Sequence, residues 1–222
     1  MISLGETLAL QTVEHFLQPE ELTQLRKIMD QHLRVAGWTS GPYAQLLLAP
    51  DGAQEILRQA TARSLPVIRR SMPSIDGDVP WHYTELLPGM SVPAHIDGIP
   101  HPATPPRRLG RIGVVVEEAD GGGQFYLETT SSGAVWSGHD VGEADGYADG
   151  TPLTHDAPHL PGPDVHAAEP PWLAGVRRTR WISDSGAGTA VAYGAQVLHG
   201  VTTVQAGRLR KFVTDLVDTN QP

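Results

Sequence analysis

The chain has 222 residues, of which 40% are hydrophobic and 18% charged. This balance suits one folded domain with its own core and excludes wholesale disorder. The absence of cysteine excludes disulfides, thiolate catalysis and cysteine-ligated metal sites. A formal net charge of −9 is a poor match for a nucleic-acid-binding surface, and no apolar run is long enough to cross a membrane. We therefore expect a small-molecule partner, with no nucleic acid and no membrane.

The first residues, MISLGETLALQ, lack a basic region before their apolar stretch, which disfavours a secretory signal. We expect a cytoplasmic protein. The sequence leaves its oligomeric state open.

Apolar residues recur at spacings of three and four over Pro19–Trp38 and again over Asp51–Ser71. This period predicts two amphipathic helices. Pro66 is expected to kink or end the second helix. Residues 1–75 are therefore predicted to form a helical support.

From Trp81 onward, the pattern changes to short runs rich in valine, isoleucine, phenylalanine and tyrosine, bounded by glycine and proline turns. No long helical pattern separates them, which disfavours a parallel sheet with crossover helices. We predict a single domain over residues 1–222, mainly β with N-terminal helices, in which residues 80–217 form a jelly roll (or a related β-sandwich). The predicted strands include Arg111–Val116, Gln124–Leu127, Thr189–Tyr193 and Leu209–Val217.

Residues 137–176 interrupt this rhythm, since they are rich in glycine, proline, aspartate and histidine and show little periodicity. We interpret them as an insertion that acts as a lid over the mouth of the site and influences substrate choice. A solvated segment is favoured over a second metal site, because the histidine spacings match no standard ligand pattern. The histidines concerned are His139, His155, His159 and His166.

His95 and Asp97 form the only His-x-Asp triplet of the chain. In a strand, residues i and i+2 point to the same side, so one imidazole and one carboxylate can bind one metal ion. Taken alone, the triplet is equally consistent with a hydrogen-bonded surface pair. Its context is more specific, because a glycine turn at residues 121–123 follows, then His199 just after a predicted strand, and Arg208 nine residues later.

This ordered set of residues resembles the iron(II)- and 2-oxoglutarate-dependent dioxygenases, and in particular their prolyl-4-hydroxylase-like branch. The resemblance implies a double-stranded β-helix, a cupin-like jelly roll. It further implies that His95, Asp97 and His199 are the catalytic iron ligands. In this family, 2-oxoglutarate is the co-substrate and O2 the oxidant, and Arg208 would bind the far carboxylate of 2-oxoglutarate.

Three further residues are candidates for the co-substrate site. Arg210 lies two residues beyond Arg208 on the same strand face and is an alternative anion-binding group. Both arginines could equally be surface residues of a terminal strand. Tyr83 and Tyr126 are candidates to hydrogen-bond a carboxylate of the co-substrate.

The resemblance implies hydroxylation of an aliphatic C–H bond of a small molecule, with release of succinate and CO2. An amino acid, a small peptide or a natural-product intermediate is expected as substrate. Asp97 disfavours halogenation, because halogenating relatives have a small residue at that position. Two alternatives stay open: the same chemistry leading to cyclisation, desaturation or epoxidation, and a cupin-like metal-binding or isomerase domain that does not use 2-oxoglutarate.

Overall fold

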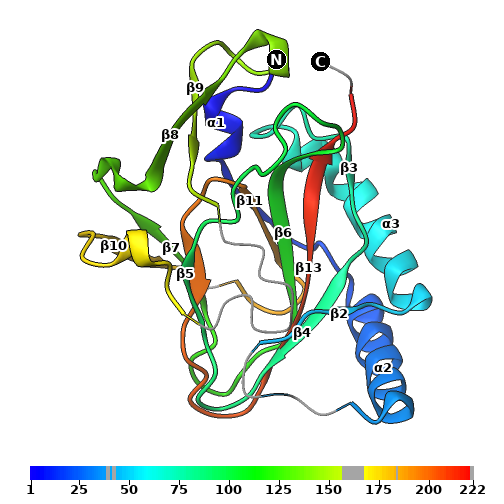
Figure 1. Cartoon of the computed structure of the whole chain (residues 1–222). Coiled ribbons are helices and arrows are strands. Elements are labelled where there is room, and N and C mark those ends of the chain that lie inside the picture. Colours follow the sequence, from blue (N-terminus) through cyan, green and yellow to red (C-terminus); the bar gives the residue numbers. More distant parts are fainter. Residues whose placement is uncertain (39–40, 42–43, 157–167, 184, 221–222) are drawn as a thin grey trace.

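The structure is a computed structural model that describes residues 1–38, 41, 44–156, 168–183 and 185–220. Two antiparallel sheets face each other, and two long helices lie along one side of the molecule, beside the larger sheet (Figure 1). The predicted fold class, mainly β with N-terminal helices around a jelly-roll core, is confirmed.

The larger sheet has the strand order β1-β11-β6-β13-β4-β2, and β3 pairs with β13 beside this path. Long strands form its middle, and the four strands named from the sequence are all present, three of them (β6, β11 and β13) in this sheet and the fourth (β7) in the smaller sheet. The bounds are β1 Leu10–Val13, β2 Leu47–Leu48, β3 Gly77–Asp78, β4 His82–Leu86, β6 Arg107–Glu117, β11 Ala190–Gly194 and β13 Leu209–Asp218.

The smaller sheet has the order β10-β7-β12-β5. From β4 to β7, and again from β10 to β13, consecutive strands alternate between the two sheets, which is the connectivity of a double-stranded β-helix. This alternation places the two sheets face to face, with an interior between them. The bounds are β5 Val92–His95, β7 Phe125–Thr129, β10 Thr179–Ile182 and β12 His199–Val201.

The helices cover the outer face of the larger sheet. They are α1 (Leu4–Thr7), α2 (Pro19–Ala36) and α3 (Asp51–Ile68), so both predicted long helices are present. Pro66 lies in the last turn of α3, which ends two residues later, as its sequence position predicts. The main core fills the space between these helices and the sheet; it includes Leu25, Met29, Leu57, Ile112 and Phe212.

Part of the insertion is ordered into regular structure. Strands β8 (Trp136–Val141) and β9 (Thr151–Thr154) form a hairpin, with short 3-10 turns at Gly133–Val135, Glu143–Asp145 and Pro171–Leu173. A second apolar cluster joins these parts to the outer side of the smaller sheet. The described part of the insertion therefore contacts the outside of the barrel; residues 157–167 lie outside the described residues. The cluster includes Val135, Trp136, Leu173, Tyr126 and Leu198.

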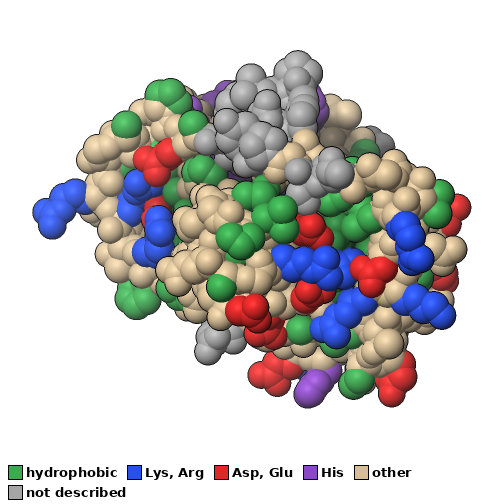
Figure 2. Space-filling view, turned by 90° about the horizontal axis from the view of Figure 1, so that it is seen from below, with side chains coloured by type: hydrophobic (Ala, Val, Ile, Leu, Met, Phe, Trp, Pro, Cys, Tyr) green, Lys and Arg blue, Asp and Glu red, His purple; other side chains and the backbone are tan. Residues whose placement is uncertain are grey.

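None of the described helices is long and apolar enough to cross a membrane. On the face drawn in Figure 2, acidic and basic side chains lie next to one another among green apolar side chains.

Candidate metal and co-substrate site

Three potential metal ligands meet between the two sheets. His95 ends β5 and His199 begins β12, and the two residues are direct partners in the strand pairing. Their ring centroids are 4.3 Å apart. Asp97 follows His95 by two residues, and one ligand atom from each of the three side chains lies within 4.8 Å of the others. All three are buried, so the structure brings together the triad that the sequence predicted.

Main-chain carbonyl groups determine which nitrogen of each histidine carries the proton. His95 Nδ1 lies 2.8 Å from the carbonyl oxygen of Pro93, and His199 Nδ1 lies 2.9 Å from that of Val197. A carbonyl oxygen only accepts, so each Nδ1 carries the proton. Each Nε2 therefore offers a lone pair toward the centre of the triad, as a metal-binding histidine requires.

Burial and neighbouring charges favour the same protonation states. Burial, with the neighbouring His199, lowers the pKa of His95 to about 3, and burial lowers that of His199 to about 4. Burial alone would raise the pKa of Asp97, but the Arg111 guanidinium and the two histidines hold it well below its usual range. At neutral pH the site therefore has two neutral imidazoles and one carboxylate.

One carboxylate oxygen of Asp97 indicates that the site suits a metal ion. Asp97 Oδ2 is buried without a hydrogen-bond partner in the part of the chain that the structure describes, and it lies 3.6 Å from His199 Nε2. A buried carboxylate oxygen without a partner is costly unless a cation satisfies it. Two imidazole nitrogens and one carboxylate oxygen on one side of a metal are typical of non-heme iron(II) oxygenases. The described residues thus fit a divalent iron.

Tyr193 places a phenol at the edge of this triad. Its hydroxyl group donates to His199 Nε2 at 3.1 Å, and burial raises its pKa well above the usual value, so it stays neutral. Tyr193 lies on β11 and faces the barrel interior. A metal on His199 Nε2 would replace this hydrogen bond and leave the hydroxyl group beside the metal.

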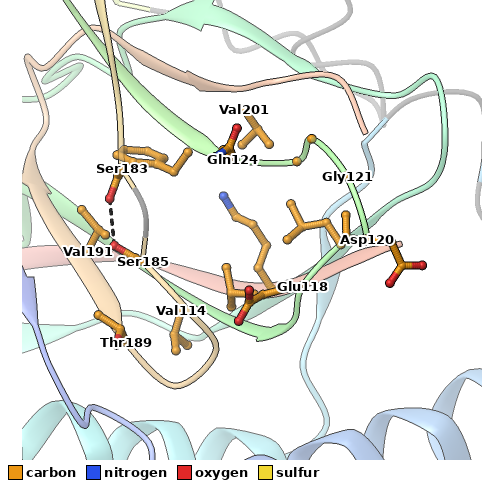
Figure 3. Close-up of a pocket in the computed structure, with 18 of the residues that line it drawn as sticks. Val114, Glu118, Asp120, Gly121, Gln124, Ser183, Ser185, Thr189, Val191 and Val201 are labelled. Carbon is orange, nitrogen blue, oxygen red and sulfur yellow. Dashed lines mark hydrogen bonds between the residues drawn. The ribbon is translucent and has the colours of Figure 1, made fainter. Parts of the chain in front are cut away.

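A cavity of about 310 Å³ extends from Tyr193 down the inside of the barrel. Figure 3 shows most of its lining, in which Glu118, Gly121 and Gln124 lie across from Ser183 and Ser185, whose hydroxyl groups are 2.8 Å apart. Its lining also contains apolar side chains, among them Val115, Phe125, Val191, Val201 and Leu209.

Lys211 provides a cation inside this cavity. It lies on β13 between Val115 of β6 and Thr84 of β4, and its side chain lines the cavity. Burial and the nearby Arg111 lower its pKa to about 8. Among the described residues, no carboxylate lies within ion-pair distance of its ammonium group. A lysine in this position can bind an anion that enters the cavity.

The two predicted anion-binding arginines lie on the other side of β13. The Arg208 side chain is 44% exposed, and its Nε donates to Glu117 at 2.7 Å. Arg210 is buried toward the helices, where its guanidinium pairs with Glu117 at 3.1 Å and with Asp30 of α2 at 2.8 Å. The structure therefore does not bring either arginine to the triad, because Lys211 has the opposite orientation on the strand.

The two predicted tyrosines also lie outside the barrel interior. The Tyr83 hydroxyl group accepts from Arg210 Nε at 2.6 Å and donates to Glu85 at 2.9 Å, on the helix side of the larger sheet. Tyr126 belongs to the outer apolar cluster, with the Arg180 guanidinium 3.8 Å above its ring. All four residues expected to bind the co-substrate thus face outward.

Sequence reasoning missed Lys211 and Tyr193. The signal for Lys211 was available in the last strand, where Phe212 and Leu216 are apolar and must face the helices. Residues 211, 213 and 215 then face the opposite way. Tyr193 had no comparable signal, because its role depends on a contact across the barrel.

No family model matches the chain, and no curated protein matches it. Several solved structures, in contrast, match the chain. A Pseudomonas putida prolyl-4-hydroxylase is 13% identical, with 95% of this chain and 94% of that chain covered and a TM-score of 0.58. A viral collagen prolyl hydroxylase from Paramecium bursaria Chlorella virus-1, in complex with 2OG, is 13% identical, with 95% and 96% covered and a TM-score of 0.55. The chain has the fold of the 2-oxoglutarate and iron(II) oxygenases.

This oxygenase fold is shared with proteins of other activities. The carbocyclase SnoK from nogalamycin biosynthesis, described as non-heme and α-ketoglutarate-dependent, is 14% identical, with 96% of this chain and 81% of that chain covered and a TM-score of 0.55. At such identities the similarity establishes the fold, and the activity has to be argued from the site.

Proposed function

We propose that this protein is an iron(II)- and 2-oxoglutarate-dependent oxygenase. The observation that carries the proposal is the position of the buried His95–Asp97–His199 triad beside a cavity containing Lys211. A triad alone would also suit a cupin-like metal-binding domain. An inward-facing lysine that has no carboxylate partner among the described residues favours a second, anionic ligand in the same cavity.

The two histidines and Asp97 would hold iron(II) through Nε2, Nε2 and Oδ2. The carbonyl groups of Pro93 and Val197 keep both Nδ1 atoms protonated, so each ring stays fixed in the ligating tautomer. Three protein ligands leave adjacent positions open for the co-substrate and O2. In the place first expected for Arg208, Lys211 would bind the far carboxylate of 2-oxoglutarate through a charge-assisted hydrogen bond.

Iron(II), 2-oxoglutarate and O2 together supply the oxidising chemistry, which converts a C–H bond to C–OH and yields succinate and CO2. The protein's own residues bind and orient the reactants. Valine and phenylalanine side chains of the cavity wall keep water away from the co-substrate chain. The Tyr193 hydroxyl group would lie beside the open metal positions and can donate a hydrogen bond there.

Hydroxylation of an aliphatic C–H bond in a small molecule is the reaction we propose. The cavity volume of about 310 Å³ is at the small end for ligand pockets, which favours compact reactants. The acidic net charge of −9 further disfavours nucleic acid. Product mass distinguishes hydroxylation, a gain of one oxygen, from desaturation or cyclisation, a loss of two hydrogens.

Anaerobic titration tests this function directly. Wild-type protein with iron(II) is expected to develop a weak visible charge-transfer band when 2-oxoglutarate is added, and His199→Ala is expected to lack it. In air, the wild type is expected to release succinate. Iron binding without the band and without succinate would contradict the proposal and favour the cupin-like alternative.

A further inference from the structure

Arg111 is the centre of a buried ion network next to the triad. It lies on β6, opposite Asp215 of β13 and Tyr193 of β11 in the strand pairing. Its Nη1 lies 2.9 Å from Asp97 Oδ1, and its Nε donates to Asp215 Oδ1 at 3.0 Å. The Arg111 side chain is only 15% exposed, so this guanidinium is built into the barrel interior.

The two oxygens of the Asp97 carboxylate are therefore unequal. Oδ1 pairs with Arg111, whereas Oδ2 is buried, has no hydrogen-bond partner among the residues described and lies 3.6 Å from His199 Nε2. A carboxylate with one oxygen held in this way presents the other oxygen alone to a metal. Binding through one oxygen leaves more positions open for other ligands than binding through both.

A second arginine fixes the position of the first. Arg108 Nε donates to Asp215 Oδ2 at 2.9 Å, and its Nη1 donates to the main-chain carbonyl of Asp97 at 3.4 Å. Asp97 lies in a loop after β5 and not within a strand. Contacts with β6 and β13 therefore tie this loop residue to the rigid sheet, as outer partners of metal ligands commonly do.

We propose that Arg111 is a positioning residue that holds Asp97 for metal binding through a single oxygen. The inference rests on the proposed metal site and adds a residue outside the ligand set. The direction in which metal affinity changes when Arg111 is removed distinguishes positioning from an effect of charge. A guanidinium repels a divalent cation, so an effect of charge alone would make the metal bind more tightly when Arg111 is removed. A positioning role makes the metal bind more weakly.

The test is anaerobic titration of the full chain with Co(II), followed by its visible absorption. Arg111→Met is expected to raise the Co(II) Kd by about 10- to 100-fold, the range for loss of an outer partner of a ligand. Arg111→Lys retains the charge but not the planar guanidinium group, so its Co(II) Kd is expected to lie between those of wild type and Arg111→Met. The Co(II) spectrum of Arg111→Met is also expected to change, because Asp97 can then rotate.

Arg107→Met is the matched control. Arg107 lies on the same strand and pairs with Asp218 of β13 in an equally buried ion pair, away from the triad. This variant is expected to lose folding stability while keeping the wild-type Co(II) Kd within about twofold, the level expected for a site without a shared partner.

The possible failures are distinguishable. Wild-type protein that binds no Co(II) would overturn the proposed metal site and this inference with it. Wild type that binds Co(II), together with Arg111→Met that binds it equally or more tightly, would overturn the positioning role alone. If Arg111→Met does not fold, Arg111→Lys decides: an unchanged Kd and spectrum contradict positioning, and a weaker Kd with an altered spectrum supports it.

Discussion

The two faces of strand β13 carry cations in very different surroundings. On the helix side, Arg208 and Arg210 pair with Glu117, and Arg210 also pairs with Asp30 and Tyr83. On the barrel side, Lys211 faces a cavity without a carboxylate in ion-pair distance among the described residues. A cation whose charge is already matched by protein carboxylates stabilises the fold. A cation that faces a cavity unpaired is available to bind a ligand.

The largest effect is expected at the inner face, in the triad. His95→Ala removes one of three proposed ligands, so we expect iron-dependent succinate formation to fall by about 100-fold or more. His101→Ala is the control, because His101 lies in the loop after the motif and is exposed. Equal activity of His95→Ala and His101→Ala would show that the triad is not the metal site.

The next effect concerns stability and the outer face. Arg210→Met removes a buried guanidinium that pairs with Glu117 and Asp30 and donates to the Tyr83 hydroxyl group, so we expect a loss of about 1–3 kcal/mol in the free energy of unfolding. Arg208→Met removes a half-exposed ion pair, so its expected cost is below about 1 kcal/mol. Denaturant unfolding of both variants measures the difference. Similar losses in the two variants would contradict the assignment of Arg210 as the structural arginine.

The pKa of Lys211 predicts how pH affects binding of 2-oxoglutarate. Burial and Arg111 lower this pKa to about 8, while Asp97 acts in the opposite direction. Only the ammonium form attracts the carboxylate, so the Kd should be constant below pH 8 and rise up to about tenfold per pH unit above it. In Lys211→Arg, the Kd for 2-oxoglutarate should stay constant up to pH 10. If the Kd of Lys211→Arg still rises above pH 8, the pH dependence arises from another group.

A further effect is the pH dependence of folding stability in the metal-free protein. The pKa values of His95 and His199 are about 3 and 4 in the folded state and about 6.5 when unfolded. Between pH 6.5 and 4, the unfolded chain therefore binds more protons than the folded one. Stability is fully present above pH 6.5 and falls as the pH drops, by up to about 1.4 kcal/mol per pH unit for each histidine.

Denaturant unfolding at pH 7 and at pH 5 measures this change. His95→Ala should reduce the difference between the two pH values, since one of the two groups is gone. An unchanged difference would show that the acid sensitivity arises elsewhere in the chain.

The sequence predicted the helices, the central strands and the His95–Asp97 pair because each depends on local spacing, whereas His199 was assigned from the resemblance to the dioxygenases. The amphipathic period defines α2 and α3, and the i, i+2 spacing places His95 and Asp97 close enough to share one proposed metal site. The residues of the proposed co-substrate site could not be predicted from local spacing. Arg210 and Lys211 are adjacent in the sequence, so an error of one residue changes which side chain is expected to face the barrel interior. The contact between Tyr193 and His199 likewise depends on the arrangement of separate strands around the barrel.

The insertion shows another limit of local patterns. Its glycine- and proline-rich composition hid the β8–β9 hairpin, because both strands are short, β8 is exposed along most of its length and β9 contains Pro152. Its packing against the outside of the smaller sheet depends on Leu173, which has no periodic apolar pattern around it in the sequence. The predicted lid over the site stays a prediction, since residues 157–167 are not described.

The most direct test of the account compares 2-oxoglutarate binding by Lys211→Met and Arg208→Met under anaerobic conditions with iron(II). The account predicts that Lys211→Met raises the Kd by about 30-fold or more, the cost of losing one partner of a buried charge pair. Arg208→Met should change it by less than about twofold, as expected of a distant, independent site. A large loss in Arg208→Met with an unchanged Kd in Lys211→Met would contradict the central claim.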